Sequence, residues 1–381
     1  MVASPELYKV RSVLGLPESC LYVCLRIGLG SYKWYTLSYS KSSSSGGGYV
    51  LSRVPMLDDG SPCVGYSDLV AVGSDIYNIG FADKPSLPTP SSGVSILDCR
   101  SNTWRKAPSM PVELHEFSAR VLDRKIYVLG RYHQDGSWKK SFQVFNTTTQ
   151  TWDLPCYGLN CHGITCFIDG KLHAVTLFDG VFAFNSKQCR WELVEQYPRM
   201  SDIMYSESYC EIDNVLYSVS DDGALRWYDT DETRWRDLKG MVGLPKLPTP
   251  LGVCSLYVKL TGYGGGKMMV SWNRNLSGHG LQRDTIFCAK IALERRNGDC
   301  WGKLEWYDSV LSVPVGSDFV KVLDWSVGIE PGPYWGQSSL QTTGPSSLGI
   351  ILILAFWAST VDNENLFKMI RSKVDGPHLL H

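Results

Sequence analysis

The segments IYNIG (residues 76–80) and IYVLG (residues 126–130) decide the fold, because each is an apolar strand with a tyrosine that ends on glycine. Other residues recur at fixed offsets behind them. In VSILDCRSNTW an Asp stands six residues before the Trp, and in FQVFNTTTQTW an Asn takes that place. The same spacing returns in VFAFNSKQCRW and LRWYDTDETRW. Recurrence at a fixed period is the sequence mark of a repeat architecture.

Each copy predicts four antiparallel strands. Apolar residues stand four, two and one positions before each Asp or Asn, which predicts a strand covered on both faces. The Asp or Asn then opens a tight turn by accepting backbone hydrogen bonds, and Trp begins the returning strand. The repeat positions are Tyr77, Gly80, Asp98 and Trp104; Tyr127, Gly130, Asn146 and Trp152; Asn185 and Trp191; and Tyr217, Asp229 and Trp235.

A four-stranded unit that returns every 40 to 50 residues or so predicts a blade of a β-propeller. The repeats run over about 69–110, 118–156, 163–197 and 207–241, and a weaker fifth copy runs over 251–310. The segments 20–39 and 319–328 are expected to close the ring as one composite blade. We therefore expect an all-β fold with six four-stranded blades.

Composition and charge narrow the class of protein. The 381 residues include 13 Trp, 20 Tyr and 36 Gly but only 20% charged residues, which favours a β-rich chain with many turns. The net charge of −1 gives no indication of a nucleic-acid or membrane-surface partner. The N-terminus lacks a signal-peptide pattern, and the twelve cysteines read as reduced core residues. A cytoplasmic or nuclear location is expected.

The repeat resembles the kelch repeat, because the WD dipeptide of WD40 blades is missing. It departs from that pattern at Gly80-Phe81 and Gly130-Arg131, where kelch repeats usually carry two glycines. The stretch ASPELYKVRSVLGLPESCLYVCL (3–25), with WYTL and LDCRSNTWRKAPSM, resembles plant F-box/kelch-repeat proteins over roughly residues 3–327. This resemblance implies a linker at 1–19, a kelch β-propeller at 20–328 and an irregular tail at 329–381. The tail's apolar run at 348–358 is too short to span a membrane.

In that family the F-box binds a Skp-type adaptor and a cullin ubiquitin ligase, and the propeller selects the protein to be ubiquitylated. The resemblance therefore implies a protein-binding propeller, a substrate-recognition subunit (or a truncated form of one) of an SCF-type E3 ligase. Nothing before Ala3 is expected to form an F-box, so adaptor and cullin are expected partners only of a longer form. No catalytic residue, metal ligand or cofactor is expected.

The alternative is a small-molecule enzyme on a kelch scaffold, such as an iron-dependent specifier protein or a copper oxidase. The ligand pattern E-x-x-x-D-x-x-x-H of the specifier proteins is met at Asp169 and His173, but Thr165 occupies the Glu position. His173 aligns with Tyr77 and Tyr127 of the repeat, so a packed strand residue is the preferred interpretation.

Two further patterns have ordinary explanations. GYGGGK (262–267) lacks the glycine and the Ser or Thr of a phosphate-binding loop, since Thr261 and Met268 stand there, and it predicts a hairpin turn. Cys156, Cys161, His162 and Cys166 lack the second Cys pair of a structural zinc site, so buried thiols are preferred.

Binding residues are sought on loops, where a rigid scaffold presents function. The distance from the strand Tyr to the hairpin Asp or Asn is 21 residues in the first copy and 19 in the second, against 12 in the later ones. Longer loops are therefore expected there, among them RYHQDGSWKKS (131–141). The candidate partner-binding residues are Phe81, Glu113, His115, Arg131, Tyr132, His133, Trp138, Lys139 and Arg199. Each could equally be an ordinary solvated residue.

Overall fold

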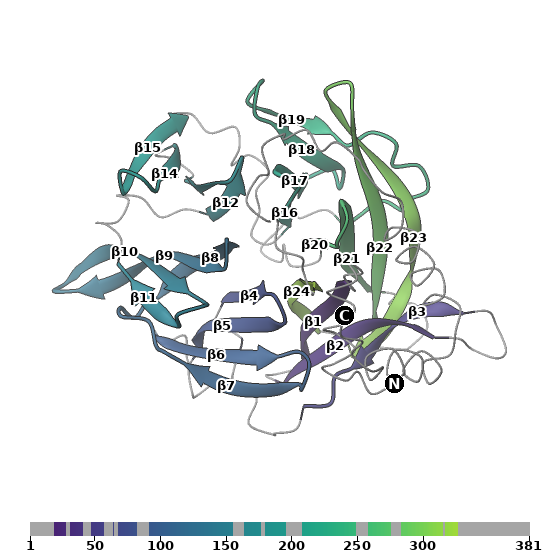
Figure 1. The fold of residues 1–381 in the computed structure, drawn as a ribbon. Coiled ribbons are helices and arrows are strands. Elements are labelled where there is room, and N and C mark those ends of the chain that lie inside the picture. The colour runs from purple at the N-terminus through teal and green to yellow at the C-terminus, as the bar shows by residue number, and fades with distance from the viewer. Residues whose placement is uncertain are drawn as a thin grey trace, which may run out of the picture. The chain divides into compact units, whose positions relative to one another are not determined.

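The computed structural model describes residues 19–27, 31–40, 47–56, 64, 68–81, 91–154, 164–176, 180–195, 208–248, 258–275, 283–314 and 317–326. Their strands form six four-stranded antiparallel sheets, which stand as blades around a common centre (Figure 1). The prediction of a six-bladed, all-β kelch-type propeller is confirmed. The tail at 329–381, with its apolar run at 348–358, lies outside the described residues.

In each blade the first-named strand is the innermost and the last-named is the outermost. Blade 1 holds β4 (Asp68–Val72), β5 (Asp75–Phe81), β6 (Gly93–Asp98) and β7 (Thr103–Ala107). Blade 2 holds β8 (Glu116–Leu122), β9 (Lys125–Gln134), β10 (Ser137–Asn146) and β11 (Thr151–Asp153). Blade 3 holds β12 (Ile164–Ile168), β13 (Lys171–Val175), β14 (Val181–Asn185) and β15 (Arg190–Glu195). Blade 4 holds β16 (Tyr209–Ile212), β17 (Val215–Val219), β18 (Leu225–Asp229) and β19 (Arg234–Asp237).

Blade 5 holds β20 (Val258–Gly262), β21 (Lys267–Asn275), β22 (Arg283–Arg296) and β23 (Asp299–Pro314). Blade 6 joins the two ends of the propeller, with β24 (Asp318–Ser326) beside β1 (Ser19–Ile27), β2 (Ser31–Ser40) and β3 (Gly48–Arg53). The apolar cores lie between neighbouring blades. The core between blades 1 and 2, for example, combines Tyr77 and Ile79 with Ile126 and Phe145. Stacked sheets bury their apolar faces in this way.

The repeat Asp or Asn closes the outer hairpin of blades 1 to 4. Its side-chain oxygen accepts the backbone N–H two residues ahead, which fixes the turn. The donors are Arg100 for Asp98 (2.9 Å), Thr148 for Asn146 (2.9 Å), Lys187 for Asn185 (3.1 Å) and Asp231 for Asp229 (3.1 Å). The six-residue spacing from the Asp or Asn to the Trp is therefore set by the length of this hydrogen-bonded turn.

The repeat Trp lies opposite the apolar residue that precedes the Asp or Asn. Its ring contacts that neighbour across the strands, with centroid distances of 4.9 Å for Trp152 and Phe145, 5.2 Å for Trp191 and Phe184, and 5.3 Å for Trp235 and Tyr228. In blade 1 the opposite residue is Leu97, and Trp104 packs on Trp34 of blade 6 at 6.0 Å. The apolar residues four, two and one positions before the turn are all buried, so the predicted cover on both strand faces is confirmed.

Blade 5 departs from the repeat. Its outer strands β22 and β23 meet in a two-residue turn at Asn297 and Gly298, both with positive φ, instead of a four-residue turn. Glu294 therefore lies opposite Trp301 within the strand pair and does not open the turn. GYGGGK forms the hairpin turn between β20 and β21 that the sequence predicts.

Blade 6 contains an outer strand that the sequence patterns do not predict. Residues 48–53 pair with β2 as the outer strand, although they follow a Ser- and Gly-rich stretch and lack the Asp-to-Trp spacing. The blade is fastened to blade 1 by two side chains. Tyr22 Oη donates to the Cys99 carbonyl at 3.1 Å, and Lys321 Nζ lies 2.7 Å from Asp68 Oδ1.

Candidate functional site

The predicted loop at 131–141 is a β-hairpin. Strands β9 and β10 pair continuously out to Gln134 and Ser137, and a two-residue turn at Asp135 and Gly136, both with positive φ, joins them. Asp-Gly is a preferred sequence for this type of turn. The expectation of a longer loop at 131–141 was wrong, because the polar residues lie on strands that extend past the core. The extra residues of blade 2 lengthen its hairpin and make it a firm support.

Four of the predicted binding residues meet on this hairpin. Trp138 is 51% exposed, and the Arg131 guanidinium lies over its ring at 4.5 Å from the centroid. His133 and His115 contact the same ring at 5.4 and 5.1 Å, both nearly perpendicular to it. His133 lies directly opposite Trp138 in the ladder, whereas His115 comes from the segment before β8. We call His115, Arg131, His133 and Trp138 the Trp138 cluster.

The other predicted residues are placed differently. Tyr132 packs against the core between blades 1 and 2, and Lys139 is held within the hairpin by Gln134 (3.1 Å) and Asp135 (3.5 Å). Glu113 is exposed. Phe81 ends β5, where its side chain is not described, and Arg199 lies outside the described residues.

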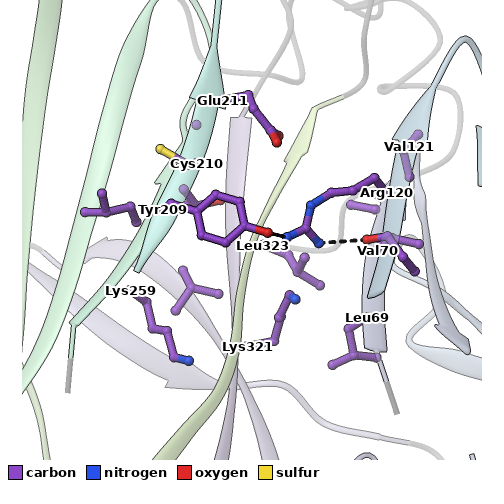
Figure 2. A pocket seen from close by; sticks show the side chains of 16 residues that line it. Leu69, Val70, Arg120, Val121, Tyr209, Cys210, Glu211, Lys259, Lys321 and Leu323 are labelled. Carbon is purple, nitrogen blue, oxygen red and sulfur yellow. Dashed lines mark hydrogen bonds between the residues drawn. The ribbon is translucent and has the colours of Figure 1, made fainter. Parts of the chain in front are cut away.

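A second candidate site lies where the inner strands meet. A pocket of about 240 Å³ is lined by residues of β4, β8, β16, β20 and β24, one strand from each of five blades. Figure 2 shows Arg120 of β8, Tyr209 and Glu211 of β16, and Lys321 of β24 around this pocket. We call this site the channel pocket.

Hydrogen bonds hold Arg120 and Tyr209 across the channel pocket. Arg120 donates from Nη1 to the Ala119 carbonyl at 2.7 Å and from Nη2 to Tyr209 Oη (Figure 2). Tyr209 Oη in turn donates to the Thr165 carbonyl at 2.9 Å. The guanidinium also lies over the Tyr209 ring, 5.1 Å from its centroid. Blades 2, 3 and 4 are thus joined through one arginine and one tyrosine.

Two carboxylates face this pair. Asp68 accepts the Ala119 N–H at 2.8 Å and the Lys321 ammonium at 2.7 Å, and its Oδ2 lies 3.9 Å from Arg120. Glu211 Oε1 accepts the N–H of Phe167 at 3.0 Å. The site therefore combines acidic and basic side chains. Their partners, which are side chains and backbone groups, come from several blades.

Burial and charge act on these groups in opposite directions. Burial opposes the charge of Arg120, but its neighbours Tyr209, Glu211 and Asp68 outweigh burial and raise the pKa of the guanidinium. Burial raises the pKa of the Glu211 carboxyl, although Arg120 and the Phe167 N–H act the other way. Burial also raises the pKa of Tyr209. Its hydroxyl therefore stays protonated and remains a donor at neutral pH.

Comparison with known proteins identifies the family. Residues 34–311 match the model described as FKB95, Kelch-repeats domain. The chain is 45% identical over 353 residues to F-box/kelch-repeat protein At5g51250 of Arabidopsis thaliana, which covers 86% of this chain and 91% of that relative. This chain belongs to the F-box/kelch-repeat family. F-box/kelch-repeat protein At3g08810 of the same plant is 45% identical over 340 residues, covering 85% of this chain and 83% of that relative.

The F-box/kelch scaffold explains why sequence reasoning missed the channel pocket. Its charged and tyrosine side chains, Arg120, Tyr209, Glu211, Lys259 and Lys321, come from four different blades, and no repeated spacing links them. The one local signal is a charged residue inside an apolar inner strand, as at Arg120 in SARVL and Lys321 in VKVL. Such a residue needs a partner, and the ring supplies it from another blade.

The structure places several of the residues that the sequence offers as possible metal ligands. His173 is buried on β13 with Nδ1 2.9 Å from the Lys171 carbonyl, and Asp169 lies in the preceding turn. Cys166 is fully buried on β12, whereas Cys156, Cys161 and His162 lie outside the described residues. Within the described ranges no three His, Cys, Asp or Glu side chains gather where they could hold a metal ion. The same ranges hold no helix of the length and apolarity that crossing a membrane requires.

Proposed function

We propose that this F-box/kelch propeller binds a protein partner through the Trp138 cluster and serves as a substrate-recognition subunit of an SCF-type E3 ubiquitin ligase. The observation that carries the proposal is the half-exposed Trp138, with the Arg131 guanidinium over its ring and two histidine rings packed nearly perpendicular to it. Relatives named F-box/kelch-repeat proteins support the ligase part of the proposal.

The Trp138 cluster has the features of a binding hot spot. Trp and Arg dominate such sites because they bury large areas, and rigid support reduces the entropy lost on binding. Continuous pairing of β9 with β10 supplies that support. The hairpin also carries Lys139 and Lys140 beside Arg131, whereas Asp135 and, opposite Arg131 on β8, Glu116 are acidic. The partner surface that fits best offers an apolar hollow for the indole with polar residues at its rim.

The test is quantitative affinity purification of the tagged protein from its own cells. Trp138→Ala removes the indole, and Lys125→Ala removes an exposed charge at the far end of the same hairpin as a control. Truncating a hot-spot Trp costs about 2 kcal/mol, which is roughly a thirtyfold loss of affinity. We expect a partner that is lost with Trp138→Ala and retained with Lys125→Ala. Identical partner sets for both variants would contradict the proposed surface.

The ligase part of the proposal needs its own test. The protein is purified from its own cells in the form in which the cells produce it, and the recovered proteins are identified. We expect a Skp-type adaptor and a cullin among them. If neither is recovered, the ligase role fails while partner binding at the Trp138 cluster still stands.

A further inference from the structure

We propose that the channel pocket binds a small neutral polyol, a sugar or a sugar alcohol, whose hydroxyl groups bridge Arg120 and Glu211. This goes beyond partner binding at the Trp138 cluster, because the pocket is lined by residues of the inner strands and by none of that cluster.

The Glu211 carboxylate offers a hydrogen-bond acceptor to a ligand. Its Oε1 accepts the N–H of Phe167 at 3.0 Å, and within the described ranges no side chain donates a hydrogen bond to it. Figure 2 shows Glu211 among the side chains that line the pocket. A carboxylate taken out of bulk water needs donors. A ligand hydroxyl in the pocket can supply one.

The Arg120 guanidinium offers hydrogen-bond donors to the same ligand. A guanidinium has five N–H groups in a rigid fork. One of them donates to the Ala119 carbonyl at 2.7 Å and another donates to the Tyr209 hydroxyl. The printed contact with Asp68 is longer, at 3.9 Å from Nη1. The two hydrogen bonds hold the guanidinium in place and leave further N–H groups for a ligand oxygen.

Arg120 and Glu211 lie near each other without direct contact. Each of them shifts the pKa of the other, so the two charges are close enough to interact. Among the contacts of the described residues, no hydrogen bond or ion pair joins the two side chains. A hydroxyl group both donates and accepts. One hydroxyl between them can therefore accept from the guanidinium and donate to the carboxylate.

A third polar group comes from blade 5. Thr261 of β20 lines the same pocket, and its hydroxyl can also donate and accept. The next residue, Gly262, lies beside blade 4, with its Cβ position 3.9 Å from the Glu211 carbonyl oxygen. Polar groups from blades 2, 4 and 5 thus converge on one space. A ligand with several hydroxyls can contact all three, which a ligand with one hydroxyl cannot.

The pairing of an arginine with a glutamate favours a neutral ligand. Arg120 attracts an anion that Glu211 repels, and the reverse holds for a cation, while burial of any ion costs more than burial of a hydroxyl. The pocket volume of about 240 Å³ corresponds to roughly eight water molecules at about 30 Å³ each. That space fits a molecule of the size of xylitol or glucose.

The test is a ligand-observed NMR titration of the purified full chain with four probes. Glucose and xylitol are neutral, gluconate carries a carboxylate and glucosamine carries an ammonium group. We expect glucose or xylitol to bind about tenfold more tightly than either charged probe, which corresponds to about 1.4 kcal/mol. Equal or tighter binding of gluconate or glucosamine would overturn the proposal, and so would no binding of both neutral probes.

Matched variants tie binding to the pocket. Glu211→Gln keeps the shape of the side chain and removes its charge, and Glu232→Gln makes the same change on the exposed outer turn of blade 4. Glu211→Gln should weaken the neutral probes several-fold, because hydrogen bonds to charged groups are the stronger ones. It should also tighten gluconate binding, because the repelling charge is gone. Glu232→Gln should change neither affinity.

The opposite signs of the two changes separate ligand contact from a structural role of Glu211. If Glu211→Gln only loosened the propeller, the affinities of the neutral probes and of gluconate would fall together. Such a joint fall, or unchanged affinities with Glu211→Gln, would overturn the proposal.

Discussion

Gly80, the last residue of IYNIG, offers a direct test of how neighbouring blades pack. Its backbone has a φ of +75°, and a Cβ placed there would lie 2.5 Å from Cζ of the Phe117 ring in blade 2. Gly136 in the β9–β10 turn has the same φ of +75° but nothing within 4 Å of its Cβ position. The two glycines therefore share the backbone requirement and differ only in the space available.

Alanine at either position must adopt a left-handed backbone, which costs about 1–2 kcal/mol. We expect Gly136→Ala to lose about 1 kcal/mol, since alanine also reduces the entropy of the unfolded chain by some 0.4–1 kcal/mol. Gly80→Ala should lose about 1–3 kcal/mol more, because the half-buried Phe117 must be displaced from the core. Urea unfolding gives both values if the slope with denaturant stays constant. Equal losses for the two variants would refute the claim that Gly80 is required for blade packing.

Three further predictions concern turns, blade closure and pH. Asn146→Ala removes the acceptor of the Thr148 N–H and should lower the free energy of unfolding by about 1 kcal/mol, whereas Asn146→Asp should retain it. Tyr22→Phe removes the donor to the Cys99 carbonyl between blades 6 and 1, with a similar loss in urea unfolding; no loss would show that this bond does not fasten the ring. Burial lowers the pKa of His173 below its ordinary 6.5, so the unfolded chain takes up the proton first and stability falls as pH drops below that value. His173→Gln should reduce the change in thermal stability between about pH 7 and pH 5. The same change in the variant and the original protein would contradict the role of His173.

Local patterns in the sequence predict most of the scaffold. The Asp or Asn turn and the Trp six residues later are set within one hairpin, so blades 1 to 4 follow from them. Strand β3 lacks that pattern and was not predicted, and the two-residue hairpin turn of blade 5 departs from it. The predicted loop at 131–141 proved to be paired strands, because polar composition does not distinguish a loop from a hairpin that extends beyond the core.

The two candidate sites also differ in how far the sequence predicts them. Arg131, His133 and Trp138 are near each other in sequence, so their shared surface could be anticipated, although the contact of His115 with Trp138 could not. The channel pocket depends on which inner strands face each other across the ring. That relation appears only when all the blades are placed, since Asp68 and Lys321 are 253 residues apart.

Site-specific photocross-linking tests the proposed binding surface most directly. A photoreactive residue at Ser137, next to Trp138 on the exposed turn, is compared with one at Ser101, on the exposed outer turn of blade 1. With the partner recovered by affinity purification, we predict a cross-link from position 137 that disappears when Trp138→Ala is added, and none from position 101. A cross-link from position 101 alone, or one from position 137 that survives Trp138→Ala undiminished, would contradict partner binding at the Trp138 cluster.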